Sequence, residues 1–212
     1  MQYIDPTVSK RKFEFELNTF KENQERYRKR GIMLLEAKFP NIYLAFISNK
    51  LIPPPIVFVV RLNFENYDME PISVRFVDPY TFQPLMSFGI EIIKKHNNTG
   101  ELQNLVQQNK GKLPFVCIRG IYEYHRHDGH SGDSWFLYRK KGGMGTMGYI
   151  IDILYTHGLT AIDNYLLNGI VKISDLRNIV NNTKKSVGNA KIVMPYKTKN
   201  LLLNIDPDKI ST

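Results

Sequence analysis

The densest group of side chains able to do chemistry lies between Cys117 and Trp135. This segment holds the only cysteine, the only tryptophan and three of the five histidines of the chain. Thiolate, imidazole and carboxylate groups are the ones that proteins use for nucleophilic catalysis and for binding transition metals. We therefore expect the functional centre of the molecule in this segment.

A first kind of site would use the cysteine as a nucleophile. Cys117 follows an apolar extended segment, and His125 or His127 would act as the base for an incoming group or would orient it. Asp133 is a further candidate for the orienting role. Arg119 follows the cysteine by two residues, so on an extended chain it projects to the same side and would favour the thiolate.

A second kind of site would use the same atoms to hold a metal ion. His125 and His127 are spaced so that they project to one side if the segment is extended. With Cys117 and His130 they would complete a tetrahedral zinc site, and Glu123 would be a ligand or would support one. The two kinds of site are partly exclusive, because a thiolate held by structural zinc is a poor acyl acceptor. A third interpretation makes the cysteine a small buried hydrophobe.

The composition describes the protein that must position this segment. The chain has 212 residues, 42% of them hydrophobic and 12% aromatic, which is typical of a globular protein. A single cysteine excludes an internal disulfide and fits a reducing compartment. The beginning of the sequence lacks the pattern of a signal peptide, and the longest strongly apolar run, 56–60, is too short to span a bilayer. We therefore expect a cytoplasmic protein with no membrane partner.

The net charge of +9 is spread along the chain. Its lysines and arginines form several separate clusters, without a nucleic-acid-binding motif. This pattern favours a solvated surface or an acidic protein partner over nucleic acid.

The first half of the sequence predicts a helix followed by a meander of four strands. A helix is expected at 9–30, ended by Gly31, with one apolar face. The residues of this face are Phe13, Leu17, Phe20, Gln24 and Tyr27. Alternating and β-branched runs predict strands at 32–37, 42–48, 56–64 and 72–77, with connections short enough for antiparallel neighbours.

The second half is less regular. We expect a helix at 101–108, an extended piece at 115–118 that leads into the histidine-rich segment, and a helix at 146–154 capped by Thr146. Ile150, Ile151 and Leu154 would face the core. Further helices are expected at 160–167 and 174–180, before a basic tail. The whole is an α+β protein, with one domain at 1–170 and a helical extension with a basic tail at 171–212.

This order of helix, four-stranded meander, extended cysteine, tryptophan and helices resembles the ubiquitin-conjugating enzyme (UBC) fold over about residues 10–160. The residues from Phe64 to Pro79 resemble the family's third and fourth strands, where a Tyr-Pro-x-x-Pro-Pro turn is followed by an x-Val-x-Phe strand and a proline. Cys117 stands where the family has its active-site cysteine, and Trp135 stands where the family's tryptophan precedes a helix. The family's His-Pro-Asn motif is absent from this sequence.

A narrower likeness concerns the site itself. Cys117, Glu123, His125 and a following histidine resemble the bacterial family named for its Cys-Glu-His-His set. That family is predicted to bind metal and is encoded beside multi-ubiquitin-like proteins and their activating enzymes.

The resemblance implies a function in ubiquitin-like conjugation. The chain would accept a ubiquitin-like protein on Cys117, as a thioester, from a ubiquitin-activating-like adenylating enzyme. It would then pass the modifier to a lysine amine of a protein substrate, and thioester exchange needs no cofactor. The alternative is a non-catalytic zinc-binding adaptor of the same pathway that uses Cys117, His125, His127 and His130. A third candidate is a basic module that binds protein or nucleic acid and has kept only the fold.

Overall fold

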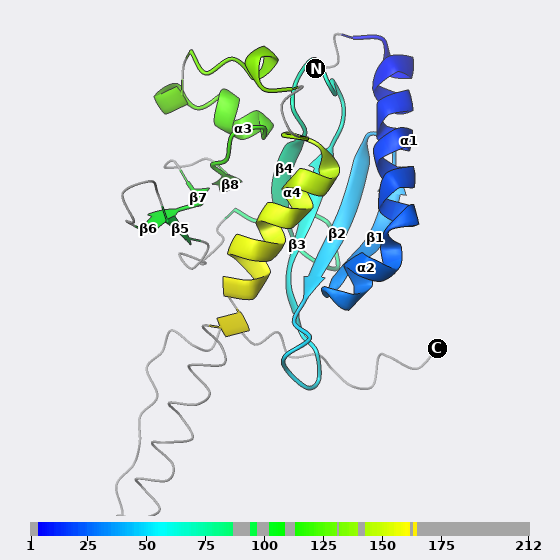
Figure 1. The fold of residues 1–212 in the computed structure, drawn as a ribbon, viewed down its shortest axis with the longest axis vertical. Helices are drawn as coiled ribbons and strands as arrows, with labels where there is room; N and C mark the ends of the chain where they lie inside the picture. Colours follow the sequence, from blue (N-terminus) through cyan, green and yellow to red (C-terminus); the bar gives the residue numbers. More distant parts are fainter. Residues whose placement is uncertain are drawn as a thin grey trace, which may run out of the picture. The chain divides into compact units, whose positions relative to one another are not determined.

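The computed structural model describes residues 4–86, 94–96, 102–108, 113–130, 132–139, 143–161 and 163–164. The chain divides into two compact units, Met1–Gly169 and Ile170–Thr212. The second unit, which contains the expected helix at 174–180 and the basic tail, lies outside the described residues. The described part is a mixed α+β structure, as the sequence predicts (Figure 1). No helix in it is long and apolar enough to cross a membrane.

The chain begins with two consecutive helices, α1 (Pro6–Glu22) and α2 (Gln24–Lys29). The Asp5 side chain caps α1 by accepting a backbone N–H at 2.8 Å, and a proline takes the first helical position. The expected helix at 9–30 is therefore interrupted at Asn23. It ends at Gly31, whose φ of 77° belongs to the region that favours glycine.

Four antiparallel strands form the main sheet in the order β1-β2-β3-β4, so the predicted meander is confirmed. They are β1 (Ile32–Lys38), β2 (Asn41–Ile47), β3 (Ile56–Asn63) and β4 (Ser73–Val77). The first two are joined by the short turn at Phe39 and Pro40. β1 and β4 are the edge strands of this sheet.

The first helix packs on the sheet with the face that its spacing predicts. Phe13, Leu17 and Phe20 are buried, whereas Gln24 is exposed, so the predicted face is wrong at that position. Tyr27 is half-buried and its ring stacks on that of Phe20, with 4.6 Å between the ring centroids. Tyr27 belongs to α2, which the break at Asn23 separates from α1.

The second helix on the core, α4 (Met147–Ile153), starts where the sequence predicts. The Thr146 hydroxyl oxygen accepts the Tyr149 N–H at 3.2 Å. The inward residues of this region are buried as expected: Ile150, Ile151 and Leu154. α4 continues into a π-helical segment, η3 (Leu154–Leu159), and helical backbone extends to 161. Where it is described, the helix expected at 160–167 is therefore a continuation of α4.

The helix expected at 101–108 is wrong. The structure instead has short strands: β5 (Lys94–His96) pairs with β6 (Leu102–Asn104), and β7 (Val106–Gln107) pairs with β8 (Phe115–Val116). The pairing of β7 with β8 uses backbone groups that a helix would need for its own hydrogen bonds. The extended piece expected at 115–118 is present as β8 and leads directly into the cysteine segment.

Candidate functional site

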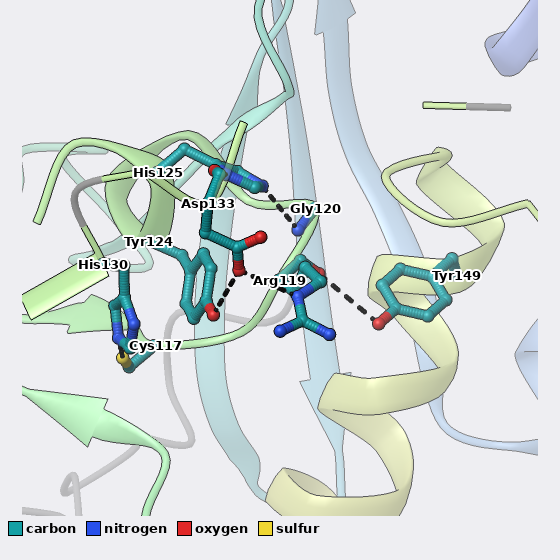
Figure 2. Close-up of polar contacts among 8 residues, drawn as sticks. All are labelled: Cys117, Arg119, Gly120, Tyr124, His125, His130, Asp133 and Tyr149. Carbon is teal, nitrogen blue, oxygen red and sulfur yellow. Dashed lines mark hydrogen bonds and ion pairs between the residues drawn. The ribbon is translucent and has the colours of Figure 1, made fainter. Parts of the chain in front are cut away.

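Cys117 lies immediately after β8, and β8 packs against edge strand β4 and the short helix α3 (Tyr122–His125) (Figure 1). Its N–H donates to the Leu105 carbonyl oxygen at 2.6 Å, which fixes the backbone at this point. The thiol is half-buried, and its Sγ lies 3.3 Å from Nε2 of His130 (Figure 2). Burial raises the pKa of the Cys117 thiol, so the thiol is protonated at neutral pH.

His130 ends the short 3-10 helix η1 (Asp128–His130). Its ring stacks on the ring of Tyr124, with 3.9 Å between centroids and 18° between planes. Burial lowers the pKa of His130, and the neighbouring His127 lowers it further. A neutral imidazole therefore faces a neutral thiol, and such a ring nitrogen can take the proton from sulfur when the sulfur attacks.

The histidine-rich segment is not extended. It forms one helical turn, α3 (Tyr122–His125), followed by η1, so the prediction that His125 and His127 project together from an extended chain is wrong. The reason is local: backbone N–H groups after Ile121 bond to carbonyl oxygens three and four residues earlier. Along this path it is His130, and not His125 or His127, whose ring contacts the sulfur.

His125 has both ring nitrogens engaged within the protein. Nδ1 bonds to the Asp133 carbonyl oxygen at 2.7 Å, and Nε2 accepts the Gly120 N–H at 3.1 Å. The ring must therefore carry its proton on Nδ1 and is neutral in this arrangement. His125 joins the cysteine segment to the loop after η1, and neither nitrogen is open to a substrate here.

His127 lies beside the pair of Cys117 and His130 without joining it. Its Nδ1 accepts the Gly129 N–H at 3.2 Å. Its ring centroid is 5.6 Å from that of His130 and 5.4 Å from that of Phe115. The role of His127 as a base stays a prediction.

Glu123 is bonded to strand β4. Its side chain is 6% exposed and accepts the Val74 N–H at 3.1 Å and a hydrogen bond from Ser73. Arg75 completes the set, with its Nε 3.2 Å from the carboxylate. Burial raises the pKa of Glu123 against the opposing effect of Arg75. Glu123 thus fastens α3 to β4.

Asp133 is the centre of a second polar group. It accepts the Tyr124 hydroxyl at 2.7 Å and the Arg119 Nε–H at 2.9 Å (Figure 2). Burial acts to raise its pKa, but hydrogen bonds from Tyr138, Tyr124 and Arg119 outweigh burial and lower the pKa to about 2. The expectation that Arg119 favours the Cys117 thiolate is wrong, because the guanidinium pairs with Asp133 and lies 4.6 Å from the centre of the Tyr138 ring.

The expected zinc ligands do not come together. Across the part of the chain that the structure describes, no three His, Cys, Asp or Glu side chains are grouped so that they can hold a metal ion. Of the five proposed ligands, Cys117 and His130 are in contact, while Glu123 is bonded to β4 and both nitrogens of His125 are used. This donor set does not fit a tetrahedral zinc site, and metal analysis of the purified protein is the test of that alternative.

Trp135 closes the segment against the scaffold. Its Nε1–H donates to the Asp68 carbonyl oxygen at 2.9 Å, which ties the segment to the loop between β3 and β4. Beneath it, Gly145 has a φ of 76°, and a Cβ there would come within 2.3 Å of Trp135 Cη2. The glycine-rich stretch before α4 therefore makes room for the indole.

Two features of the site were not predicted: the contact of His130 with the sulfur and the stacking of Tyr124. Both depend on the path of two short helical turns. No local spacing in the sequence signals either contact, because both join residues on different turns.

The comparisons with known proteins cover both the scaffold and this segment. The model of the Y4jH family, described as Y4jH-like, matches residues 4–162. The chain is also similar to "Uncharacterized protein y4jH" of Sinorhizobium fredii (strain NBRC 101917 / NGR234). The two are 35% identical over 176 residues, which cover 74% of this chain and 85% of the relative. The names of these two matches make no mention of ubiquitin-like conjugation. With most of its length matched by the family model, the chain belongs to the Y4jH family.

Proposed function

We propose that this protein is a UBC-like acyl carrier that accepts a ubiquitin-like modifier on Cys117 as a thioester and passes it to an amine. The observation that carries the proposal is the contact of 3.3 Å between Cys117 Sγ and His130 Nε2. A thiol with a raised pKa needs a base beside it before it can attack a carbonyl carbon, and this imidazole is that base.

The scaffold supports the same proposal. An N-terminal helix, a four-stranded antiparallel meander, a cysteine after a short strand and a tryptophan before a helix follow one another in the order that resembles the UBC fold. Cys117 directly follows β8 and is half-buried, so part of the residue is exposed to a partner. A fold alone does not define an activity, and the proposal therefore depends on the pair of side chains.

In the first step the modifier arrives as a thioester on its activating enzyme. Cys117 Sγ attacks the carbonyl carbon while its proton moves to His130 Nε2. A new carbon–sulfur bond forms to Cys117 as the old one to the donor breaks. The donor sulfur leaves as a thiolate and takes the proton from His130, so the imidazole is neutral again at the end of the exchange.

In the second step a neutral amine of the protein substrate attacks the carbonyl carbon of the Cys117 thioester. The new bond is an amide, and the bond from carbon to Cys117 Sγ breaks. His130 takes a proton from the attacking nitrogen and gives it to the departing sulfur. Asp133 and His125 hold the segment in place during both steps, through the contacts described above.

The test is to load the protein from its own pathway. The purified chain would be incubated with ATP, an adenylating enzyme and a ubiquitin-like protein from the same organism. We expect an adduct that thiols cleave, that is absent from Cys117→Ala and that forms more slowly in His130→Ala. His157→Ala, a histidine on η3 outside the site, is the matched control and should load normally. No adduct, with partners shown to form their own thioester, would reject the proposal.

A further inference from the structure

We propose that Tyr124 is a positioning residue that holds the His130 ring against Cys117 by stacking, in place of the hydrogen bond that usually orients a catalytic histidine. This inference rests on the proposed function, because it assigns Tyr124 a role in the same site. The Tyr124 ring contacts those of His130 and His125 and its hydroxyl bonds to Asp133, so its proposed effect on the sulfur passes through His130.

The stacking geometry is close and the phenol is fixed. The two ring centroids lie 3.9 Å apart with the planes within 18° of parallel, and Tyr124 is 9% exposed. A ring held face to face in this way cannot turn about its own Cβ–Cγ bond without losing the contact. His130 is therefore restricted to orientations that keep its edge toward the sulfur.

Among the described residues, the ring of His130 lacks the usual orienting contact. A catalytic histidine commonly bonds through its second nitrogen to a carboxylate or a carbonyl oxygen, which sets the tautomer and the angle of the ring. In the structure's described segments, the hydrogen-bond contact of the His130 ring is the one from Nε2 to the sulfur. The stacked phenol is the contact left to set the angle of the imidazole.

Tyr124 is itself anchored to the segment that carries the cysteine. Its hydroxyl donates to Asp133, whose carbonyl oxygen bonds to His125 Nδ1, and His125 Nε2 accepts the Gly120 N–H. Figure 2 shows the Tyr124 hydroxyl at the Asp133 carboxylate and the His125 ring at Gly120. The chain of contacts returns to a residue three positions after the cysteine, so the phenol is linked to the segment that carries the thiol.

The experiment uses the alkylation rate of the single cysteine by iodoacetamide, measured from pH 6 to pH 9 on the full chain. No partner protein is needed, and every adduct is on Cys117 because the chain has one cysteine. Below the pKa of the thiol, a positioned base should raise the rate over that of His130→Ala by about tenfold, a modest part of what general-base catalysis supplies. Thermal melting checks that each variant is folded.

The alkylation rate of Tyr124→Met should depend on pH as that of His130→Ala does. The double variant Tyr124→Met/His130→Ala should be no slower than either single variant. Tyr124→Phe, which keeps the stacked ring and loses the bond to Asp133, should retain most of the wild-type rate. Tyr80→Phe is the control, because Tyr80 is exposed and lies outside the cysteine segment in the sequence. Its alkylation rate should match that of the wild type. Equal losses in Tyr124→Met and Tyr124→Phe would overturn the proposal, as would additive losses in the double variant.

If Tyr124→Met does not fold, the ring protons of His130 carry the same comparison by NMR. They should be shifted upfield by the phenol in the wild type and in Tyr124→Phe, and an unshifted ring in the wild type would contradict the stacking. If Tyr124→Met slows alkylation as expected but the loading reaction gives no thioester adduct, Tyr124 remains a positioning residue and only the conjugation function is rejected. If the thioester adduct forms but Tyr124→Met changes neither the alkylation rate nor the His130 ring shifts, only the positioning role of Tyr124 is rejected.

Discussion

The four-stranded sheet and the segment from Cys117 to Arg139 are held together in different ways. The sheet packs a continuous apolar core against α1 and α4, with Phe46, Phe64 and Phe76 almost fully buried. The described part of the cysteine segment consists of short helical turns and loops. Ile118 and Ile121 join the apolar core, and the rest is fixed by single polar contacts of Glu123, Asp133 and others. Many small contributions hold the scaffold, whereas a few specific ones hold the site. Substitutions in the two regions should therefore differ in kind, and the following ones test that difference.

The largest effect is expected in the core. Phe64 is fully buried and meets Phe13 and Tyr67 edge to face, with 5.3 Å between centroids in both pairs. Phe64→Ala should lower the free energy of unfolding by about 3–5 kcal/mol, because it removes apolar contacts and leaves a cavity. Denaturant unfolding measures this loss. A cost near zero would mean that the scaffold is not the tightly packed unit that its burial indicates.

A smaller loss is expected where the segment meets the scaffold. Gly145→Ala combines a positive φ with a Cβ that would lie 2.3 Å from Trp135, and should cost about 2–3 kcal/mol and disturb tryptophan fluorescence. Gly132→Ala is the matched control, since its φ of 102° is also positive but nothing lies within 4 Å of its Cβ. The difference between the two variants isolates the clash with the indole. Equal costs would show that Trp135 does not pack on Gly145.

The smallest effect on stability is expected from Asp133, and it should depend on pH. The pKa of Asp133 is about 2 in the folded state and its ordinary value is 3.8, so the folded state favours the ionised form. The stabilising contribution is therefore complete above pH 4 and is lost as the pH falls toward 2. Asp133→Asn should flatten this part of the stability profile, measured by denaturant unfolding at several pH values. Asp128→Asn, an exposed carboxylate of the same segment, should leave the profile unchanged.

The same contrast decides what could be predicted from the sequence. The strands were predicted because their β-branched and alternating residues repeat over five to eight positions. Their antiparallel pairing was predicted from the short connections between them. The stretch 101–108 was predicted as a helix and forms strands, since its polar residues have no strong period and its pairing with β8 is a tertiary contact. A local sequence pattern does not predict the secondary structure of a segment that is fixed by pairing with a distant strand.

For the site, composition located the segment but not the geometry. Cys117 was predicted as its centre, and the structure brings a histidine to its sulfur. The histidine is His130, which was expected only as a metal ligand, because the turn of α3 changes which side chains face the thiol. The capping Thr146 was predicted correctly since a cap depends on neighbours within three residues. Contacts between rings such as Tyr124 and His130 have no comparable local rule.

The most direct test of the account is the mass of the intact protein after a single loading reaction with its activating enzyme and modifier. We predict a gain equal to the modifier less one water, removed by hydroxylamine, located on Cys117 and formed about 10²-fold more slowly in His130→Ala. A gain that resists hydroxylamine, or equal loading rates in the wild type and His130→Ala, would contradict the role of this pair.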